Sequence, residues 1–274
     1  MTARRAFVAG CQRSGTTLLR FLLGAHPGVR SVDEAAAYPE LTGAAPAPAG
    51  DQLAVYKIPR FAEQLLAADV RDELYGSAPQ FYRREPVVFV VRDPRDVVAS
   101  MCSLKAGRDR SWIDAYGRAM LEHRLAARPE FVARHGARCD ALRRRDWPPH
   151  LTAALYWQVR NEALPAYLAA GLPVLPLGYE RLVAEPRPAL QAICRRFGLT
   201  WDERMLRHQE VEHDQLDANG LAIGNSDPKR AIDRDSVGRH RKLLAPDAAA
   251  EVTAATDDLF TELQRLIANA GANP

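Results

Sequence analysis

The sequence predicts one α/β domain in which a central, mostly parallel sheet lies between layers of helices. Short apolar runs alternate with segments of helical periodicity, which favours parallel strands joined by crossover helices. The first apolar run, Ala6–Gly10, leads through a glycine-containing turn into a helical segment, the order of a P-loop-like three-layer domain. The 274 residues suffice for one large domain with a substantial core, and no linker or internal repeat divides them.

Strands are expected where short apolar runs end at glycine, proline or a charged residue. The run ending at Val91 is the clearest, because it is continuously apolar and Arg92 follows it directly. Pro176 weakens the last run, since proline inside a strand is tolerated mainly at a sheet edge. The predicted strands are Ala6–Gly10, Leu53–Ile58, Pro86–Val91 and Pro173–Gly178.

Helices are expected where apolar residues recur at helical spacing between start and stop signals. Pro94 with aspartates around it is typical of a helix start, because proline fits the first turn and acidic groups favour the positive helix end. The predicted helices are Thr16–Ala25, Phe61–Leu74, a helix from Pro94 to about Leu104, Trp112–Arg145 with breaks near Pro129 and His135-Gly136, Pro148–Ala170, Pro188–Phe197, Trp201–His208, Val237–Leu244 and Pro246–Ala268. Loops are expected at Ala35–Asp51 and Gln209–Asp235.

The composition is that of an ordinary soluble protein, with 47% hydrophobic residues and a net charge of +3. This charge is too small to argue for a nucleic-acid partner. Leu18–Leu23 is too short to span a membrane, and the start of the chain lacks a secretory pattern. The four cysteines are widely spaced without a close histidine, so neither a metal site nor a disulfide framework is expected. We expect a cytoplasmic protein without a membrane anchor.

The most informative segment is Gly10-Cys11-Gln12-Arg13-Ser14-Gly15-Thr16-Thr17, directly after the first predicted strand. Its glycines have the P-loop spacing, but Thr16 stands where such a loop normally carries lysine. A strand–turn–helix junction directs backbone N–H groups and the positive helix dipole at an anion. The loop therefore predicts a phosphate or sulfate site, and not the triphosphate site of an ordinary nucleotide hydrolase.

A second anion site is indicated by Arg92 and Ser100. Arg92 leaves the end of a buried strand, and Ser100 lies two helical turns into the following helix. Together they could hold one phosphate, and hydrogen bonds to charged groups are worth roughly 1.5–3 kcal/mol each. The alternative is a strand-end arginine that is paired with Asp93 or Asp96.

The two segments together resemble the sulfotransferases, which use 3′-phosphoadenosine 5′-phosphosulfate (PAPS) as donor. In that family the first loop holds the 5′-phosphosulfate, and the later arginine and serine hold the 3′-phosphate. The pattern is most similar to the tyrosylprotein sulfotransferases and their bacterial relatives. It continues at His26-Pro27, Val29-Arg30, Asp33-Glu34, Leu172-Pro173-Val174, Tyr179-Glu180-Arg181-Leu182 and Asn225-Ser226-Asp227.

The resemblance implies roles for individual residues. Glu34 stands where that subfamily carries its catalytic carboxylate and is the expected general base, with Asp33 as the alternative. Lys57, in a Lys-x-Pro context, would contact the bridging oxygen of the departing phosphate, and Arg13 would stabilise non-bridging oxygens. The implied donor-binding residues are Arg13, Ser14, Gly15, Thr16, Thr17, Arg92, Ser100, Tyr179, Ser226 and Arg239, the last in a glycine-and-basic segment.

We therefore expect one sulfotransferase domain over residues 1–274, with a helical acceptor-side insertion at about 105–150. A sulfuryl group would pass in line to a hydroxyl or amine of a small-molecule, glycan or peptide acceptor, with no metal required. The basic cluster Arg138, Arg143, Arg144 and Arg145 could meet an acidic acceptor or form a solvated face. The absence of a membrane anchor or disulfide pattern favours a bacterial small molecule or glycan.

Two other functions are compatible with such a loop. A P-loop kinase acting on a small molecule would need a lysine at Thr16, or a substitute for it, and an acidic ligand for Mg²⁺. A non-catalytic nucleotide-binding module could be built on the same scaffold. Trp157 is expected in the core, with a place near the nucleotide as the alternative.

Overall fold

A computed structural model describes residues 4–46, 50–72, 76–106, 109–126, 128–144, 147–215 and 226–272. These residues form two compact units. The first unit contains the chain up to Arg92, Ala163–Arg234 and the residues from Leu263 onward. The second unit contains Asp93–Glu162 and Asp235–Glu262.

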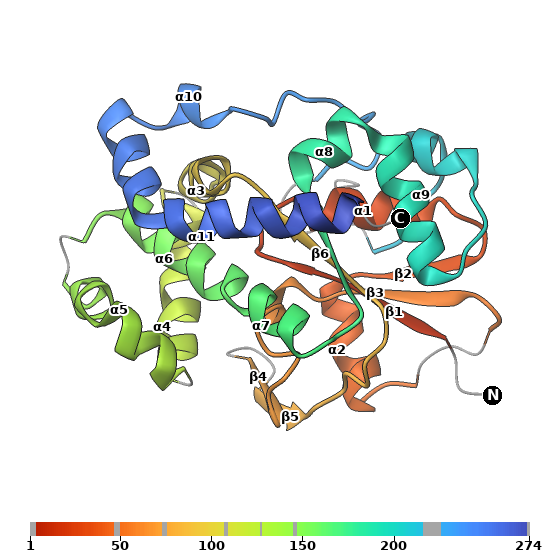
Figure 1. Ribbon diagram of the computed structural model, residues 1–274, viewed down its shortest axis with the longest axis horizontal. Helices are drawn as coiled ribbons and strands as arrows, with labels where there is room; N and C mark the ends of the chain where they lie inside the picture. The colour runs from red at the N-terminus through yellow and green to blue at the C-terminus, as the bar shows by residue number, and fades with distance from the viewer. Residues whose placement is uncertain are drawn as a thin grey trace. The chain divides into compact units, whose positions relative to one another are not determined.

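The first unit is built on a five-stranded sheet in the order β2-β3-β1-β6-β7, and all neighbouring strands are parallel (Figure 1). This confirms the predicted fold class. The strands are β1 (Arg5–Gly10), β2 (Val29–Val32), β3 (Leu53–Lys57), β6 (Val87–Val91) and β7 (Val174–Gly178). Pro176 lies in the edge strand β7, where a missing N–H removes the fewest ladder bonds. Because the strands run the same way, their carboxyl ends meet at one edge of the sheet.

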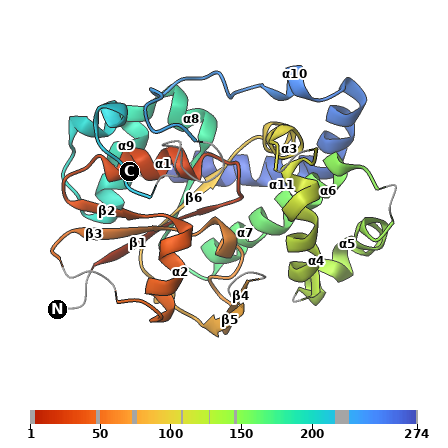
Figure 2. The ribbon, with the colours of Figure 1, turned by 180° about the vertical axis from the view of Figure 1, so that it is seen from behind.

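Helices cover both faces of this sheet and complete the three layers. They are α1 (Thr16–Gly24), α2 (Glu34–Thr42), α7 (Ala163–Ala169), α8 (Tyr179–Ala184) and α9 (Pro186–Phe197), with the 3₁₀ segments η1 (Pro59–Phe61) and η3 (Glu203–Glu210). Figures 1 and 2 show α1, α8 and α9 on one face, and α2 with α7 on the other.

Alternation along the strands explains why both faces are covered. Val8 and Val88 belong to the core that includes residues of α1 and α9. Their neighbours in sequence point to the opposite face, where the ring of Phe89 lies 6.4 Å from that of Tyr167 in α7. Strands that are buried on both faces read as continuous apolar runs, which is why β6 is readable from the sequence.

The expectation of a loop at Ala35–Asp51 is wrong for its first part, which forms α2. Asp33 caps this helix by accepting a hydrogen bond from the backbone N–H of Glu34 at 2.6 Å. Tyr38 stacks on Phe61 with ring centroids 5.6 Å apart. The cap, the alanines and this packing outweigh Pro39 inside the helix.

The expectation of a helix at Phe61–Leu74 is also wrong. The chain there turns through η1 into β4 (Asp69–Asp72), which pairs antiparallel with β5 (Gly76–Pro79). The Gln64 side chain bonds both backbone groups of Arg71, at 2.8 and 3.0 Å. The short strand β2 has no counterpart among the predicted strands, because only its two end residues are fully buried.

The second unit is helical. It contains α3 (Pro94–Ser103), the π-helical turn η2 (Ile113–Gly117), α4 (Arg118–Ala126), α5 (Pro129–Leu142), α6 (Pro149–Asn161), α10 (His240–Leu243) and the part of α11 (Pro246–Ala272) up to Glu262. The predicted breaks at Pro129 and His135 are confirmed, since α5 begins at the first and has non-helical backbone angles at the second.

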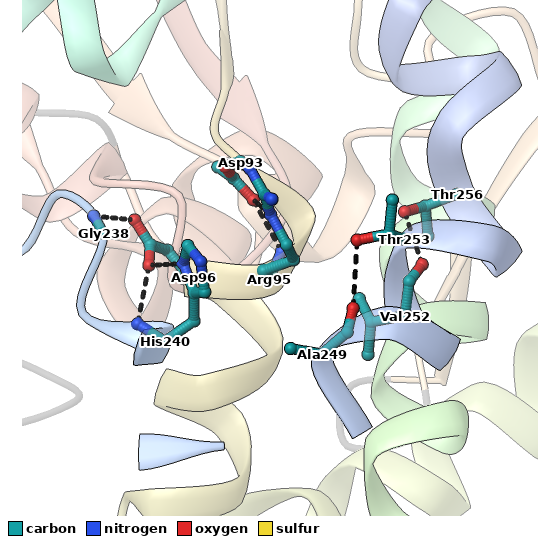
Figure 3. Close-up of polar contacts among 9 residues, drawn as sticks. All are labelled: Asp93, Arg95, Asp96, Gly238, His240, Ala249, Val252, Thr253 and Thr256. Atoms are coloured by element: carbon teal, nitrogen blue, oxygen red, sulfur yellow. Dashed lines mark hydrogen bonds and ion pairs between the residues drawn. The ribbon is translucent and has the colours of Figure 1, made fainter. Parts of the chain in front are cut away.

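The core of the second unit contains Trp157, which is fully buried with its ring 6.0 Å from that of Phe260. The core alternative for this tryptophan is therefore the one that the structure supports. The buried hydroxyl of Thr256 donates to the carbonyl of Val252 one turn earlier, at 2.8 Å (Figure 3). None of the described helices, including α11 with its 27 residues, has the length and apolar character that a membrane crossing requires.

The junction between β1 and the following loop generates a stability prediction. Gly10 has a φ of 131°, and a Cβ there would lie 2.3 Å from the backbone oxygen of Val90 on the neighbouring strand. Gly43 also has a positive φ, 78°, but has open space at the Cβ position. We expect Gly10→Ala to lower the free energy of unfolding by more than about 3 kcal/mol and Gly43→Ala by about 1 kcal/mol. Urea unfolding measures both, and equal losses would contradict the close approach of β1 and β6.

Candidate functional site

Apart from Ser226, the residues predicted for the site within the first unit lie at or just after the ends of strands. Lys57 ends β3, Asp33 and Glu34 follow β2, Arg92 follows β6 and Tyr179 follows β7. The P-loop-like segment follows β1. In open α/β sheets, ligands bind at this carboxyl edge. The topology therefore places these predicted positions along one edge of one sheet.

The loop after β1 has the backbone of an anion nest. Arg13 and Gly15 adopt positive φ values of 70° and 94°, and α1 begins directly after them at Thr16. No described side chain caps this helix start, so backbone N–H groups of the first turn remain available for an anion. The Ser14 hydroxyl is fully buried and has no hydrogen-bond partner among the described residues. This buried hydroxyl is available to bond a bound anion or an ordered water.

Arg92 and Tyr179 form one wall of the loop. Arg92 is 7% exposed, and its Nη1 donates to the carbonyl of Arg13 at 3.1 Å. Its guanidinium carbon lies 4.4 Å from the centre of the Tyr179 ring, within cation–π range. A Cβ at Gly15 would lie 2.3 Å from this ring, so the loop passes Tyr179 at a distance that only glycine permits. The structure thus brings four of the predicted donor-binding positions, Arg13, Gly15, Arg92 and Tyr179, into contact with one another.

A buried ion pair supplies the loop with an ammonium group. The Nζ of Lys57 lies 2.9 Å from Oδ1 of Asp33 and donates to the hydroxyl of Thr17 at 3.2 Å. The side chains of Lys57 and Asp33 are 3% and 1% exposed. Thr17 is the second residue of α1, so a lysine from β3 reaches the loop that lacks its own.

Asp33 also has a second cationic partner, Arg20, which was not among the residues predicted for the site. Arg20 of α1 donates through Nη1 to Oδ2 of Asp33 at 3.3 Å and through Nη2 to the carbonyl of Asp214 at 2.6 Å. Burial lowers the pKa of Arg20, and Asp33 and Asp214 partly offset this effect. The side chain of Gln215 accepts from the backbone N–H of Asp33 at 2.5 Å. The interruption of an apolar helix by Arg20 was the available signal for this network.

A neutral histidine packs against α1. His208 of η3 is fully buried and stacks on the ring of Phe21 in α1, with centroids 6.1 Å apart. Burial lowers the pKa of His208 to about 4, and the nearby His213 adds to this effect. The imidazole is therefore uncharged at neutral pH, and η3 packs on Phe21 through a neutral ring.

Two predicted donor-binding residues, Ser100 and Arg239, belong to the second unit. Ser100 lies in the last turn of α3 and is partly buried, and Arg239 is exposed just before α10. Ser226, in the first unit, is partly buried, whereas Asn225 lies outside the described residues. The pairing of Arg92 with Ser100 stays a prediction.

Asp93 and Asp96, which are the alternative partners predicted for Arg92, make hydrogen bonds within the second unit. Asp93 accepts from Arg95, with an Nη2–Oδ2 distance of 2.6 Å. Asp96 accepts from the backbone of Gly238 at 2.7 Å and of His240 at 2.9 Å (Figure 3). Both carboxylates therefore have partners within the second unit.

The arginines of the predicted basic cluster at residues 138–145 differ in their surroundings. Arg138 donates to the carbonyl of Ala255 and the side chain of Gln158, both at 3.0 Å, which links α5 to α11 and α6. Arg143 and Arg144 are exposed, and Arg145 lies outside the described residues. Among the described residues, no group of three or more histidine, cysteine, aspartate and glutamate side chains could hold a metal ion.

Comparison with known families decides the classification. A family model described as "Sulfotransferase family" matches residues 5–85 and 79–203. The chain belongs to this family. It is 27% identical over 221 residues to "Protein-tyrosine sulfotransferase 2" of Gallus gallus, covering 75% of this chain and 54% of that protein. It is 26% identical over 220 residues to "Protein-tyrosine sulfotransferase 1" of Danio rerio, covering 75% and 56%. The chain thus spans about half the length of these relatives.

Solved sulfotransferase structures share the fold at low sequence identity. The sulfotransferase domain from the curacin biosynthetic pathway aligns with a TM-score of 0.55 and 14% identity, over 93% of this chain and 98% of that one. A mouse sulfotransferase complexed with PAP aligns with a TM-score of 0.54 and 15% identity, over 96% and 89%. These similarities place the sheet and its helices within the sulfotransferase fold.

The buried pair generates a prediction for stability. Asp33→Asn leaves Lys57 and Arg20 without their carboxylate, and we expect it to lower the free energy of unfolding by about 3–5 kcal/mol. Lys57→Met should also lower the free energy of unfolding. The double variant Asp33→Asn/Lys57→Met should lower it by at least about 1 kcal/mol less than the sum of the two single effects, because the two side chains stabilise each other. Urea unfolding of all three variants measures this coupling.

The exposed pair of Arg187 with Glu203 offers a control. Glu203→Gln removes a carboxylate from an arginine at the surface and should leave the stability nearly unchanged. Additive losses for Asp33→Asn and Lys57→Met would show that the two side chains do not stabilise each other.

Proposed function

We propose that this chain transfers a sulfuryl group from PAPS to a hydroxyl or amine of an acceptor. The observation that carries the proposal is the buried pair of Asp33 and Lys57, which holds an ammonium group at Thr17 of a loop without its own lysine. The loop thereby has the charge for a phosphosulfate, and the family of the chain supports this chemistry.

The residues at the loop fit the 5′-phosphosulfate of the donor. The nest at Arg13 and Gly15 directs backbone N–H groups at an anion, and the buried hydroxyl of Ser14 is available to donate to one of its oxygens. Thr16 and Thr17 open α1 and add the positive end of the helix. When bound, PAPS supplies the sulfuryl group and a phosphate leaving group.

Lys57 would stabilise the charge that grows on the leaving phosphate. Its ammonium group is already oriented by Asp33 and Thr17, so little reorganisation is needed when this charge develops. Arg13 would act on the non-bridging oxygens from the loop itself.

Glu34 would act as general base and take the proton of the acceptor hydroxyl or amine. It is the first residue of α2, directly after Asp33. Asp33, the alternative base, is committed to Lys57, Arg20 and the backbone of Glu34, which favours a positioning role for it. A correctly placed base typically contributes 10²–10⁴-fold to the rate.

The 3′-phosphate of the donor would be held by a second set of groups. Arg92 supplies a guanidinium next to the loop, and Tyr179 lies against both Arg92 and Gly15. Ser100, Ser226 and Arg239 complete the proposed set. Such a set would discriminate against ATP and ADP, which have no 3′-phosphate.

The acceptor is proposed as a class. The helical segment at about 105–150, with the exposed Arg143 and Arg144, is proposed to shape the acceptor side of a single functional domain. A small molecule or glycan of a bacterial cell is the favoured acceptor, and a peptide is the alternative suggested by the names of the curated relatives.

Transfer of labelled sulfate from PAPS to a panel of phenols, sugars and tyrosine peptides tests the proposal. Glu34→Gln should lower kcat by about 10²–10⁴-fold while the dissociation constant for 3′-phosphoadenosine 5′-phosphate (PAP) stays within about threefold. Glu40→Gln, on the same helix, is the control and should retain the wild-type rate.

Three outcomes would count against parts of this account. Unchanged sulfation by Glu34→Gln would exclude this residue as the base. Turnover of ATP that depends on Mg²⁺, without use of PAPS, would favour a kinase. Tight binding of PAP without transfer to any acceptor would favour a nucleotide-binding module.

A further inference from the structure

The carboxylate of Asp96 binds a chain segment that lies more than 140 residues away in sequence. Its Oδ2 accepts from the backbone N–H of Gly238 at 2.7 Å. Its Oδ1 accepts from the backbone N–H of His240 at 2.9 Å and from the His240 ring nitrogen Nδ1 at 2.7 Å. Figure 3 shows both oxygens of Asp96 directed at this segment.

This contact is buried and specific. Asp96 is 2% exposed and His240 is 6% exposed, whereas Arg239 between the two anchored residues is exposed. Gly238 has a φ of 71°, so the chain turns there and its N–H and that of His240 reach one carboxylate. Two hydrogen bonds to the backbone and one to the His240 ring therefore hold the chain on both sides of Arg239, whose own side chain is exposed.

The helix that supplies the carboxylate also carries Ser100. Asp96 and Ser100 both lie in α3, four residues apart, so their side chains leave the same face of the helix one turn apart. The hydrogen bonds of Asp96 to Gly238 and His240 therefore set the position of Arg239 relative to Ser100 within the second unit.

We propose that Asp96 is a positioning residue that fixes Arg239 relative to Ser100 and so completes the part of the 3′-phosphate site that the second unit supplies. This role rests on the proposed function, because it presumes a donor with a 3′-phosphate. In this role Asp96 acts through Arg239 and not through a contact of its own with the donor. Its carboxylate removes the freedom of the Gly238–His240 segment before the donor binds, so less ordering remains for the binding step.

If Asp96 has this role, its removal should weaken the binding of a nucleotide only when that nucleotide carries a 3′-phosphate. The probes are PAP and adenosine 5′-monophosphate, which differ only in that group. The readout, by calorimetry, is the dissociation constant of adenosine 5′-monophosphate divided by that of PAP, which is the preference for the 3′-phosphate. Asp96→Ala should lower this ratio by about tenfold, as expected for one misplaced charged hydrogen bond, and change the affinity for adenosine 5′-monophosphate by less than about threefold. Asp96→Asn should show a smaller loss, since its one amide oxygen can still accept from His240.

A double-mutant cycle tests whether Asp96 acts through Arg239. In the background of Arg239→Ala, Asp96→Ala should lower the ratio by no more than about twofold further. Asp93→Asn is the matched control, because it removes a carboxylate from the same helix start and asparagine remains a good cap. It should keep the wild-type ratio.

Amide hydrogen exchange without nucleotide tests the anchor separately from the donor. The N–H groups of Gly238 and His240 should lose protection in Asp96→Ala while α6 stays protected, which also shows that the variant is folded. Unchanged protection, equal losses of affinity for both probes, or additive effects with Arg239→Ala would overturn the proposal. A wild-type protein without preference for PAP would overturn the donor assignment itself, and with it this role.

Discussion

The buried carboxylate of Asp33 is the group on which the arrangement of the proposed site depends. It accepts from Lys57 at the end of β3 and from Arg20 of α1, and it caps α2 through the backbone of Glu34. Its own backbone N–H is bound by Gln215 from a distant segment. The side chain and the backbone N–H of this one residue thus connect four parts of the chain around the proposed base and the loop. A buried carboxylate is tolerated there because both of its oxygens have cationic partners.

The parallel sheet explains why a loop without the usual lysine can still be well supplied with cations. Each strand of the sheet ends at the same edge, so side chains that follow different strands converge there. Lys57 comes from β3 and Arg92 from β6, on the two sides of β1 and its loop. A threonine at position 16 is therefore compatible with strong anion binding, because the charge is provided by neighbouring strands.

The sequence indicated the parts of the proposed site that depend on local order, and the roles of these residues stay predictions. Gly15 and Arg92 follow apolar runs, and a side chain after a buried parallel strand reaches the ligand edge wherever the rest of the chain lies. The network of Arg20 and Gln215 was not predictable, because its partners to Asp33 are 13 and 182 residues away. Asp96 is a similar case, since its position favours a helix start and its partners are 142 and 144 residues distant.

The two wrong element assignments have the same origin. Residues 35–42 form a helix because Asp33 caps it and Tyr38 finds the ring of Phe61. Residues 69–72 form a strand because Gln64 and the partner strand β5 satisfy their backbone. Neither tertiary contact is visible in local periodicity, which describes only the face that a segment would bury.

The most direct test of the central claim is a calorimetric titration of the wild-type protein with PAP and with ADP in the presence of a metal chelator. The claim is that this edge of the sheet is a phosphosulfate and 3′-phosphate site and not a damaged ATP site. It predicts that PAP binds at least about 100-fold more tightly than ADP, as two charged hydrogen bonds to the 3′-phosphate would provide. Equal affinities, or binding only of ATP and only with Mg²⁺, would contradict it.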